Sequence, residues 1–295
     1  MDKKTKIIIA LAAIGLVLFC VGAYLGGSLT SLPTIFSEEI LPEGALSEDE
    51  INIKDVHSIE VNLINSDITV KTGTEFHLTG PGLYSNYVKD GVFYGGATEA
   101  KHNAKLFGAR ISAPQKWIYG HGSYVLTIPE KAEIESIKIN GSHCDITGDT
   151  LTIKSVEFLV PSGDIEFNKI DAENLNISAK NLHITDAQAI QSAKIAVTKE
   201  VSLGNEASVA NVLQNLSLTS SRGNVTVFGK VLGNSSISAE RGGIAATLSG
   251  SSKNYTMRSL GGELAIGTEV GAEASEEHFG DISFSNKETA NVHFK

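Results

Sequence analysis

The sequence predicts an all-β protein in which a single-sided stack of short strands forms a β-solenoid, preceded by one N-terminal transmembrane helix. A short phrase recurs three times between Leu216 and Ile266, as LSLTSSRGNVTVFG, SISAERGGIAATLSG and YTMRSLGGELAIG. Each copy alternates apolar and polar residues on both sides of a glycine-containing corner, which is the period of a half-buried strand. Asn224, Gly243 and Glu263 stand at the same corner position, 19 and then 20 residues apart. A period of about 20 residues is typical of stacked repeats.

One repeat of this kind cannot bury its own apolar face, whereas repeats stacked coil on coil share a continuous core. Weaker versions of the same corner occur at Asp67, Asp145, Asp164 and Asp281, so we expect one register from about Glu135 to the C-terminus. The residues just after each corner should then form one buried ladder. Its expected members are Ile146, Ile165, Val225, Ile244, Leu264 and Ile282.

The N-terminal segment has the pattern of a membrane anchor. Three lysines within the tail of residues 1–6 precede an uncharged run over residues 7–27, long enough to cross a hydrocarbon core of about 30 Å. The basic tail predicts a single-pass protein of the cell membrane, with a cytoplasmic N-terminus and an extracytoplasmic solenoid. A cleaved signal peptide is the alternative. The length of the run, and the lack of a small-x-small site after it, favour an uncleaved anchor.

Two further segments separate the predicted anchor from the regular coils. Residues 28–50 are acidic and contain Pro33 and Pro42, which predicts an extended stalk outside the membrane. The solenoid should occupy residues 51–295. Within it the period is lost over about residues 79–123, a stretch that contains most of the tyrosines and the single tryptophan.

This irregular, aromatic-rich insertion has two interpretations. Its rings could form an interaction surface, because tyrosine and tryptophan combine rigid contact area with a polar group. They could instead close the open end of the solenoid against pairing with other strands. Solvent exposure of the rings favours the first interpretation and complete burial the second. The candidate surface residues are Tyr84, Tyr87, Tyr94, Trp117 and Tyr119.

Charge and motifs exclude several classes of function. A net charge of −10 argues against nucleic acid as a partner, because phosphate binding needs clustered lysine and arginine. The sequence has no phosphate-binding loop, dinucleotide fingerprint or nucleophile elbow, and no histidine spacing typical of zinc. We therefore predict no catalytic residue, no cofactor and no metal site. Cys20 lies in the predicted membrane helix and Cys144 at a corner, so the two cannot form a disulfide within one chain.

Asp145 and Asp164 are the one pair that could support enzymatic chemistry. Placed one coil apart, their carboxylates would be near enough to bind a cation or to act together on a polysaccharide. The alternative is structural, since aspartate is favoured in turns, where it bonds nearby backbone. Asn224, Gly243 and Glu263 at equivalent positions favour the structural alternative, because the corner tolerates the loss of aspartate.

The order of these features resembles a known family. The strand LTIPEKAEIESIKIN is followed by GSHCDIT, VPSGDIEF, SSRGNVTV, ERGGIAAT and FGDISF. Over Val56 to His293 this succession is similar to the bacterial putative-adhesin family, a β-strand-repeat domain of unknown function. Gly243 and Glu263 depart from its usual aspartate. The resemblance implies a right-handed β-helical fold on an extracytoplasmic face and transfers no catalytic residue. Members with one N-terminal helix resemble Gram-positive envelope proteins, some of them linked to envelope stress.

Together these features predict a membrane-anchored, non-catalytic module of the bacterial cell envelope, adhesin-like or scaffolding in function. Its expected partners are the membrane, through the N-terminal helix, and a cell-wall polymer, a host surface or another membrane protein. One alternative is a regulatory accessory of an envelope-stress response. Another is a carbohydrate-active enzyme that uses the corner carboxylates.

Overall fold

The computed structural model describes residues 56–80, 86–96, 102–106, 109–113, 122–130, 132–205, 211–269 and 277–295. Contacts divide the chain into two compact units, residues 1–40 with 99–120 and residues 41–98 with 121–295. In the first unit the described strands are β6 (His102–Leu106) and β7 (Ala109–Ala113), which pair antiparallel. All other described elements belong to the second unit. The described residues form strands and one short 3-10 turn, η4 (Ser252–Asn254), so the predicted all-β class is confirmed.

The predicted membrane helix over residues 7–27 and the stalk over residues 28–50 lie outside the described residues. Among the residues that are described, no helix has the length and apolarity needed to cross a membrane.

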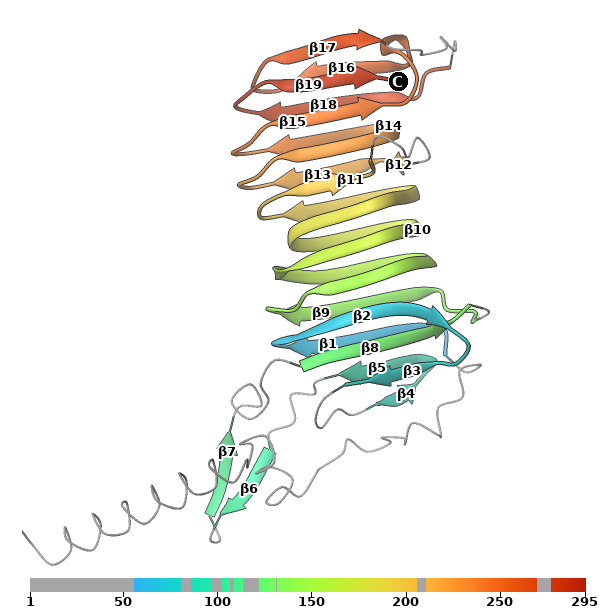
Figure 1. Cartoon of the computed structure of the whole chain (residues 1–295), viewed down its shortest axis with the longest axis vertical. Helices are drawn as coiled ribbons and strands as arrows, with labels where there is room; N and C mark the ends of the chain where they lie inside the picture. The colour runs from blue at the N-terminus through green and yellow to red at the C-terminus, as the bar shows by residue number, and fades with distance from the viewer. Residues whose placement is uncertain are drawn as a thin grey trace, which may run out of the picture. The chain divides into compact units, whose positions relative to one another are not determined.

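The strands of the second unit are wound as the coils of a β-solenoid (Figure 1). They pair in parallel with the strand one coil away, except that β3 and β4 pair antiparallel with β8 and β5. β10 is a continuous ribbon of 52 residues that winds through several coils. The strands are β1 (Ser58–Ile64), β2 (Ser66–Gly73), β3 (His77–Thr79), β4 (Tyr87–Lys89), β5 (Val92–Gly96), β8 (Gly122–Pro129), β9 (Ser136–Ser142), β10 (Ile146–Val197), β11 (Val201–Leu203), β12 (Val212–Gln214), β13 (Leu216–Ser220), β14 (Val225–Ala239), β15 (Ile244–Leu248), β16 (Tyr255–Ser259), β17 (Leu264–Glu269), β18 (Gly280–Asn286) and β19 (Ala290–Phe294).

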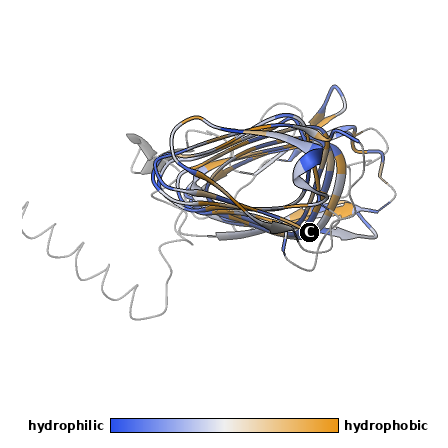
Figure 2. Cartoon of the chain, turned by 90° about the horizontal axis from the view of Figure 1, so that it is seen from above, coloured by the Kyte–Doolittle hydropathy of each residue, from blue (hydrophilic) through white to orange (hydrophobic). Residues whose placement is uncertain are grey.

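The core lies inside the coils, which superimpose as a flattened ring when seen along the stack (Figure 2). Alternate residues of each strand point inward and are buried, as in β13, where Leu216 and Leu218 are buried while Ser217 is exposed. Aromatic rings also pack against each other in the core, where Phe158 and Phe167 are stacked with their centroids 5.6 Å apart. Burial of each such large apolar side chain stabilises the fold by about 1.5–3 kcal/mol.

The predicted ladder is confirmed over the middle of the stack. Ile146, Ile165, Val225 and Ile244 are all at most 1% exposed, and Val225 pairs directly with Ile244 in the next coil. One shift of register by a single residue would turn all of these side chains to solvent, so their burial is a direct test of the repeat alignment.

The ladder prediction is wrong at the C-terminal end, where the coils do not stack in chain order. β18 lies between β14 and β16, and β19 lies between β15 and β17 (Figure 1). Ile244 therefore pairs with Ala290, and Leu264 pairs with Ala290 from the other side. Leu264 belongs to the outermost coil and is only half-buried.

Because of this stacking order, Ile282 and Asp281 lie on a different side of the stack from the predicted ladder and corner series. Ile282 pairs with Ser235 and Met257, and Asp281 pairs with Asn234. Asp281 is therefore not a member of the corner series that contains Asp145 and Asp164. The sequence could not reveal this difference. Asp281 follows Glu263 by 18 residues and stands in a Gly-Asp-Ile motif like that of Asp164, and two strands on different sides of one coil have the same alternation of inward and outward residues.

The N-terminal end of the stack repeats this arrangement. β1 lies between β5 and β9, and β2 lies between β8 and β10. The first coil in the chain is thus the second coil in space, and the coil that covers it comes from later residues. At each end of the stack, the strands nearest the chain terminus are held between two neighbours.

Strands from the predicted insertion contribute to the outermost N-terminal coil. Phe93 of β5 is fully buried and meets the Phe76 ring edge-on, with centroids 4.8 Å apart. Leu78 of β3 is also buried. These apolar side chains give this end of the stack a closed core.

Candidate functional site

A row of corner side chains forms hydrogen bonds between neighbouring coils. The Asp67 carboxylate accepts a hydrogen bond of 3.0 Å from the backbone N–H of Asp145. The Asp145 carboxylate accepts one of 2.7 Å from the backbone N–H of Asp164. The same contact recurs where the corner residue is an amide, since Asn181 accepts from the N–H of Glu200 at 3.2 Å and Asn224 from that of Gly243 at 3.0 Å. We call this set the corner row.

The predicted pair of carboxylates is part of this row. Asp145 and Asp164 do stack one coil apart, as predicted, but their oxygens are engaged with the fold. The Asp164 carboxylate also accepts from the side-chain amide of Asn181 at 2.8 Å and lies 3.0 Å from the Lys180 Nζ. The geometry supports the structural interpretation of these aspartates.

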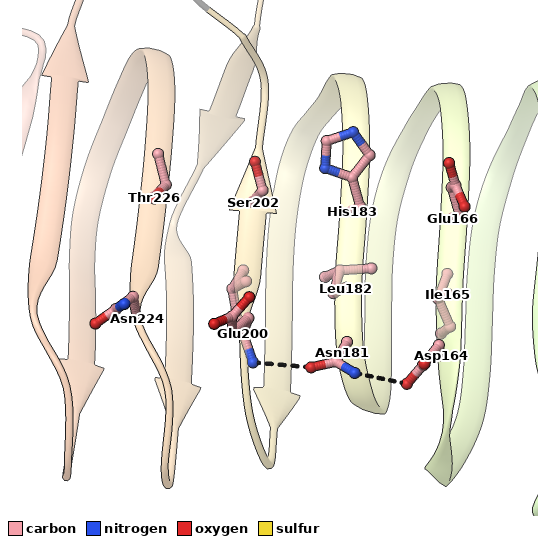
Figure 3. A pocket seen from close by; sticks show the side chains of 11 residues that line it. Asp164, Ile165, Glu166, Asn181, Leu182, His183, Glu200, Ser202, Asn224 and Thr226 are labelled. Atoms are coloured by element: carbon pink, nitrogen blue, oxygen red, sulfur yellow. Dashed lines mark hydrogen bonds between the residues drawn. The ribbon is translucent and has the colours of Figure 1, made fainter.

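A second row of side chains lies beside the corner row, two residues further along each strand. It consists of Glu166 and His183 of β10, Ser202 of β11 and Thr226 of β14, which lie side by side on four coils (Figure 3). Neighbouring members are separated by roughly the strand spacing of 4.8 Å. Within the described residues, none of these four side chains makes a hydrogen bond or an ion pair to the protein. We call this set the outer row.

The two rows line a shallow groove with a volume of about 420 Å³. Its walls carry carboxylates from Asp164, Glu166 and Glu200, together with one imidazole, two hydroxyls and two amides. The residues that line it include no lysine or arginine, and Lys180 beside it is paired with Asp164. The groove is therefore acidic and offers both donors and acceptors of hydrogen bonds.

The described part of the chain contains no group of three or more His, Cys, Asp or Glu side chains placed to hold a metal ion. Glu166 and His183 occupy successive coils, but the neighbours that continue their row are the hydroxyls of Ser202 and Thr226.

Two of the five predicted surface aromatics fall within the described residues. Tyr87 and Tyr94 are a cross-strand pair of β4 and β5, and their rings stack with centroids 4.9 Å apart and planes inclined by 16°. Both side chains are partly buried, which distinguishes them from the fully buried Phe93 beside them. Tyr84, Trp117 and Tyr119 lie outside the described residues.

The outer row was not singled out from the sequence. The corner residues are recognisable because glycine and Asx residues recur there, whereas the position two residues later holds glutamate, histidine, serine or threonine. The outer row could have been found only by position, because each of its members is the first outward-facing residue after a corner. It is blurred because the coil from Asn181 to Glu200 spans 19 residues and the next, from Glu200 to Asn224, spans 24.

Comparison with solved structures found two crystal structures whose descriptions mention adhesion. A putative adhesin from Bacteroides fragilis NCTC 9343 is 11% identical, with a TM-score of 0.27, over 81% of this chain and 92% of the other. A putative cell adhesion protein from Clostridium sporogenes ATCC 15579 is 12% identical, with a TM-score of 0.21, over 83% of this chain and 96% of the other.

Comparison with curated proteins found no match. A scan of family models matched one, described as Toastrack DUF4097, to residues 56–293.

Proposed function

The chain belongs to the Toastrack DUF4097 family, and from this premise we propose that it is a non-catalytic, adhesin-like binding module of the bacterial cell envelope. In this proposal residues 7–27 anchor the chain in the cell membrane, residues 28–50 act as a spacer, and the solenoid binds its ligand outside the cell. The lysines before the uncharged run, and the acidic residues after it, support this placement.

The observation that carries the binding function is the contrast between the corner row and the outer row. Carboxylates and amides of the corner row satisfy backbone N–H groups of the next coil and are therefore used by the fold. The outer-row side chains have no such contact among the described residues and stay available to a ligand. A catalytic site would instead need a nucleophile or base oriented by a hydrogen-bonded neighbour. Glu166 and His183 have no such orienting partner in the described part of the chain.

The spacing of the outer row indicates an extended ligand. Four polar side chains on successive coils present hydrogen-bonding groups about every 4.8 Å along a straight line. A polymer with repeated hydroxyl and amide groups can meet such a line at several points at once, and weak contacts made together give useful affinity. A cell-wall glycan has these groups.

The charge of the groove selects among polymers. Three carboxylates line it, and the chain as a whole has a net charge of −10. Neutral or cationic glycans can approach such a surface, whereas anionic polymers rich in phosphate are repelled. We therefore propose neutral cell-wall glycan as the ligand class.

The test is co-sedimentation of the full-length chain in detergent with purified, insoluble cell-wall glycan from which anionic polymers have been removed. A triple variant with Glu166→Ala, His183→Ala and Ser202→Ala should lose most of the binding. The matched control changes Lys194→Ala, Ser217→Ala and Ser236→Ala, which are exposed on adjacent coils of a different face.

Two results would contradict the proposal. Equal binding by the triple variant and the wild type would show that the groove is not the binding surface. The second result has two parts: the wild type fails to bind the glycan, and it captures a membrane protein instead. If the control variant also captures that protein and the triple variant does not, a regulatory accessory would be favoured.

A further inference from the structure

The C-terminal end of the solenoid exposes the interior of its last coil. β16 pairs only with β18, and β17 only with β19, among the described strands, so each has one edge without a strand partner there. Ile266 is 51% exposed although it pairs with the buried Val292 and has the same inward alternation. Met257 and Leu264 are inward-facing and half-buried, and Leu260 at the corner is 61% exposed.

In the adjacent coil, which is covered on both sides, the inward-facing side chains are buried. Ile282, Phe284 and Val292 are each at most 1% exposed. The outermost coil therefore has the composition of a covered coil, with apolar side chains facing the interior, and on one side it has no neighbour among the described strands. Unpaired strand edges and exposed core side chains of this kind mark a surface for pairing with another chain.

We propose that this end coil docks on the end coil of a second copy of the same chain, forming a two-fold symmetric, end-to-end dimer. The surface contains two strand edges with apolar side chains between them. A single extended peptide covers only one of these edges, whereas another end coil covers both edges and the core at once. A two-fold axis makes the contact self-complementary, because the same patch serves in both partners.

The charges of the end coil suit self-association. The coil from Ser251 to Glu269 contains Lys253, Arg258, Glu263 and Glu269, a net charge of zero from two basic and two acidic residues. The whole chain has a net charge of −10, so this coil is a place where two copies can approach with little repulsion.

The register of the contact follows from the two-fold axis. With the axis at Met257, the two β16 strands (Tyr255–Ser259) run antiparallel and Met257 faces its own copy. In this register Arg258 faces Thr256 of the partner rather than another arginine. The inference goes beyond the proposed glycan function and does not depend on it.

A cysteine placed on the proposed axis tests the contact directly. In a Cys20→Ser background of the full-length chain in detergent, Met257→Cys should form a disulfide-linked dimer under mild oxidation, because directly opposed Cβ atoms in antiparallel strands lie within disulfide reach. Ser236→Cys, exposed on the outer face of β14 and separated from the end coil by β18, is the matched control and should form no disulfide-linked dimer.

Analytical ultracentrifugation gives a second, independent measurement. Wild type should sediment as a concentration-dependent dimer, and Ile266→Lys should weaken self-association by roughly tenfold or more, because a charge would be buried in the contact. Circular dichroism confirms that the variant is folded. A wild-type monomer at tens of micromolar, or equal cross-linking of both cysteine variants, would overturn the proposal. So would a dimer that appears only when residues 270–276 are replaced by a glycine–serine linker, since that segment would then be the occupant.

Discussion

The Asp145 carboxylate accepts a 2.7 Å hydrogen bond from the backbone N–H of Asp164, one coil further along the stack. The Asp145 N–H in turn donates to the Asp67 carboxylate at 3.0 Å. A side chain that looks catalytic by its type and spacing thus accepts a hydrogen bond from the backbone of the next coil at a corner. The repeated corner aspartates are a device for stacking coils.

This role predicts how substitutions at Asp145 divide. Asp145→Ala should lower the free energy of unfolding by about 1 kcal/mol, because the Asp164 N–H loses its acceptor. Asp145→Asn should retain most of that free energy, because an asparagine oxygen can accept the same hydrogen bond, as Asn224 does from the N–H of Gly243. Urea denaturation of the purified chain measures both. If asparagine were as damaging as alanine, the negative charge itself would be required and the structural role would be wrong.

The stacking order at the C-terminal end is testable by a pair of truncations. Phe284 lies in the covered coil and is fully buried, so Phe284→Ala should cost about 3–5 kcal/mol of unfolding free energy. Leu264 lies in the outermost coil and is half-buried, so Leu264→Ala should cost clearly less than a buried leucine, about 1–2 kcal/mol. If the coils stacked in the order of the chain, β18 would be outermost, and Phe284→Ala would then cost less than Leu264→Ala. Thermal or urea denaturation of the two variants decides between the orders.

His143 is held in a left-handed backbone conformation, with φ of 57°, and its side chain is exposed. Its neighbour one coil away, Asn65, has the same conformation, with φ of 49°. His143→Gly should raise the unfolding free energy by about 0.5–1 kcal/mol, because glycine removes the steric cost of positive φ and that gain exceeds the added freedom of the unfolded chain. His143→Ala, which keeps the steric cost, is the control and should bring no gain. A destabilising glycine variant would show that the imidazole contributes to stability.

Cys144 offers a test that depends on pH. Its thiol is fully buried and donates to the Ser142 carbonyl oxygen at 3.2 Å, and burial raises the thiol pKa above its ordinary value. A raised pKa in the folded state means that stability is fully present below the ordinary thiol pKa of about 8.5 and falls as pH rises above it, because only the unfolded chain can release the proton there.

In a Cys20→Ser background, a thiol reagent should therefore modify Cys144 only as fast as the protein opens, and denaturant should accelerate the reaction strongly. Replacing Cys144 with alanine should remove the part of the alkaline loss of stability that this thiol contributes. Rapid modification of the native protein at neutral pH would show that the thiol is accessible.

The stacked pair of Tyr87 and Tyr94 tests whether the aromatic end is an interaction surface. Tyr87→Ala should reduce binding of the envelope partner by several-fold while changing stability by about 1 kcal/mol or less, because the side chain is only partly buried. Tyr87→Phe keeps the stack of rings, 4.9 Å apart, and separates the contribution of the hydroxyl from that of the ring. Unchanged binding of the alanine variant, with a large loss of stability, would assign the pair to closure of the end.

Much of the fold could be predicted because its determinants are local. The alternation around Val225 and Ile244 places these side chains inward, and the glycine-containing corners set the length of each coil. The candidate groove was harder to predict. Glu166 and His183 are common residue types on an outer face, and only the vertical alignment of coils of unequal length brings them next to Ser202 and Thr226.

The sequence by itself determined the all-β class, and in the middle of the stack it determined the inward ladder and the position of the corners, because strand alternation and turn chemistry are properties of neighbouring residues. The tertiary structure decided the order of the end coils and the role of the corner aspartates. β18 and β19 join the stack between strands that precede them in the chain. This stacking order buries Phe284 and Val292 between two neighbouring coils. Burial between two coils depends on the assembled stack, so it cannot be predicted from a local sequence pattern.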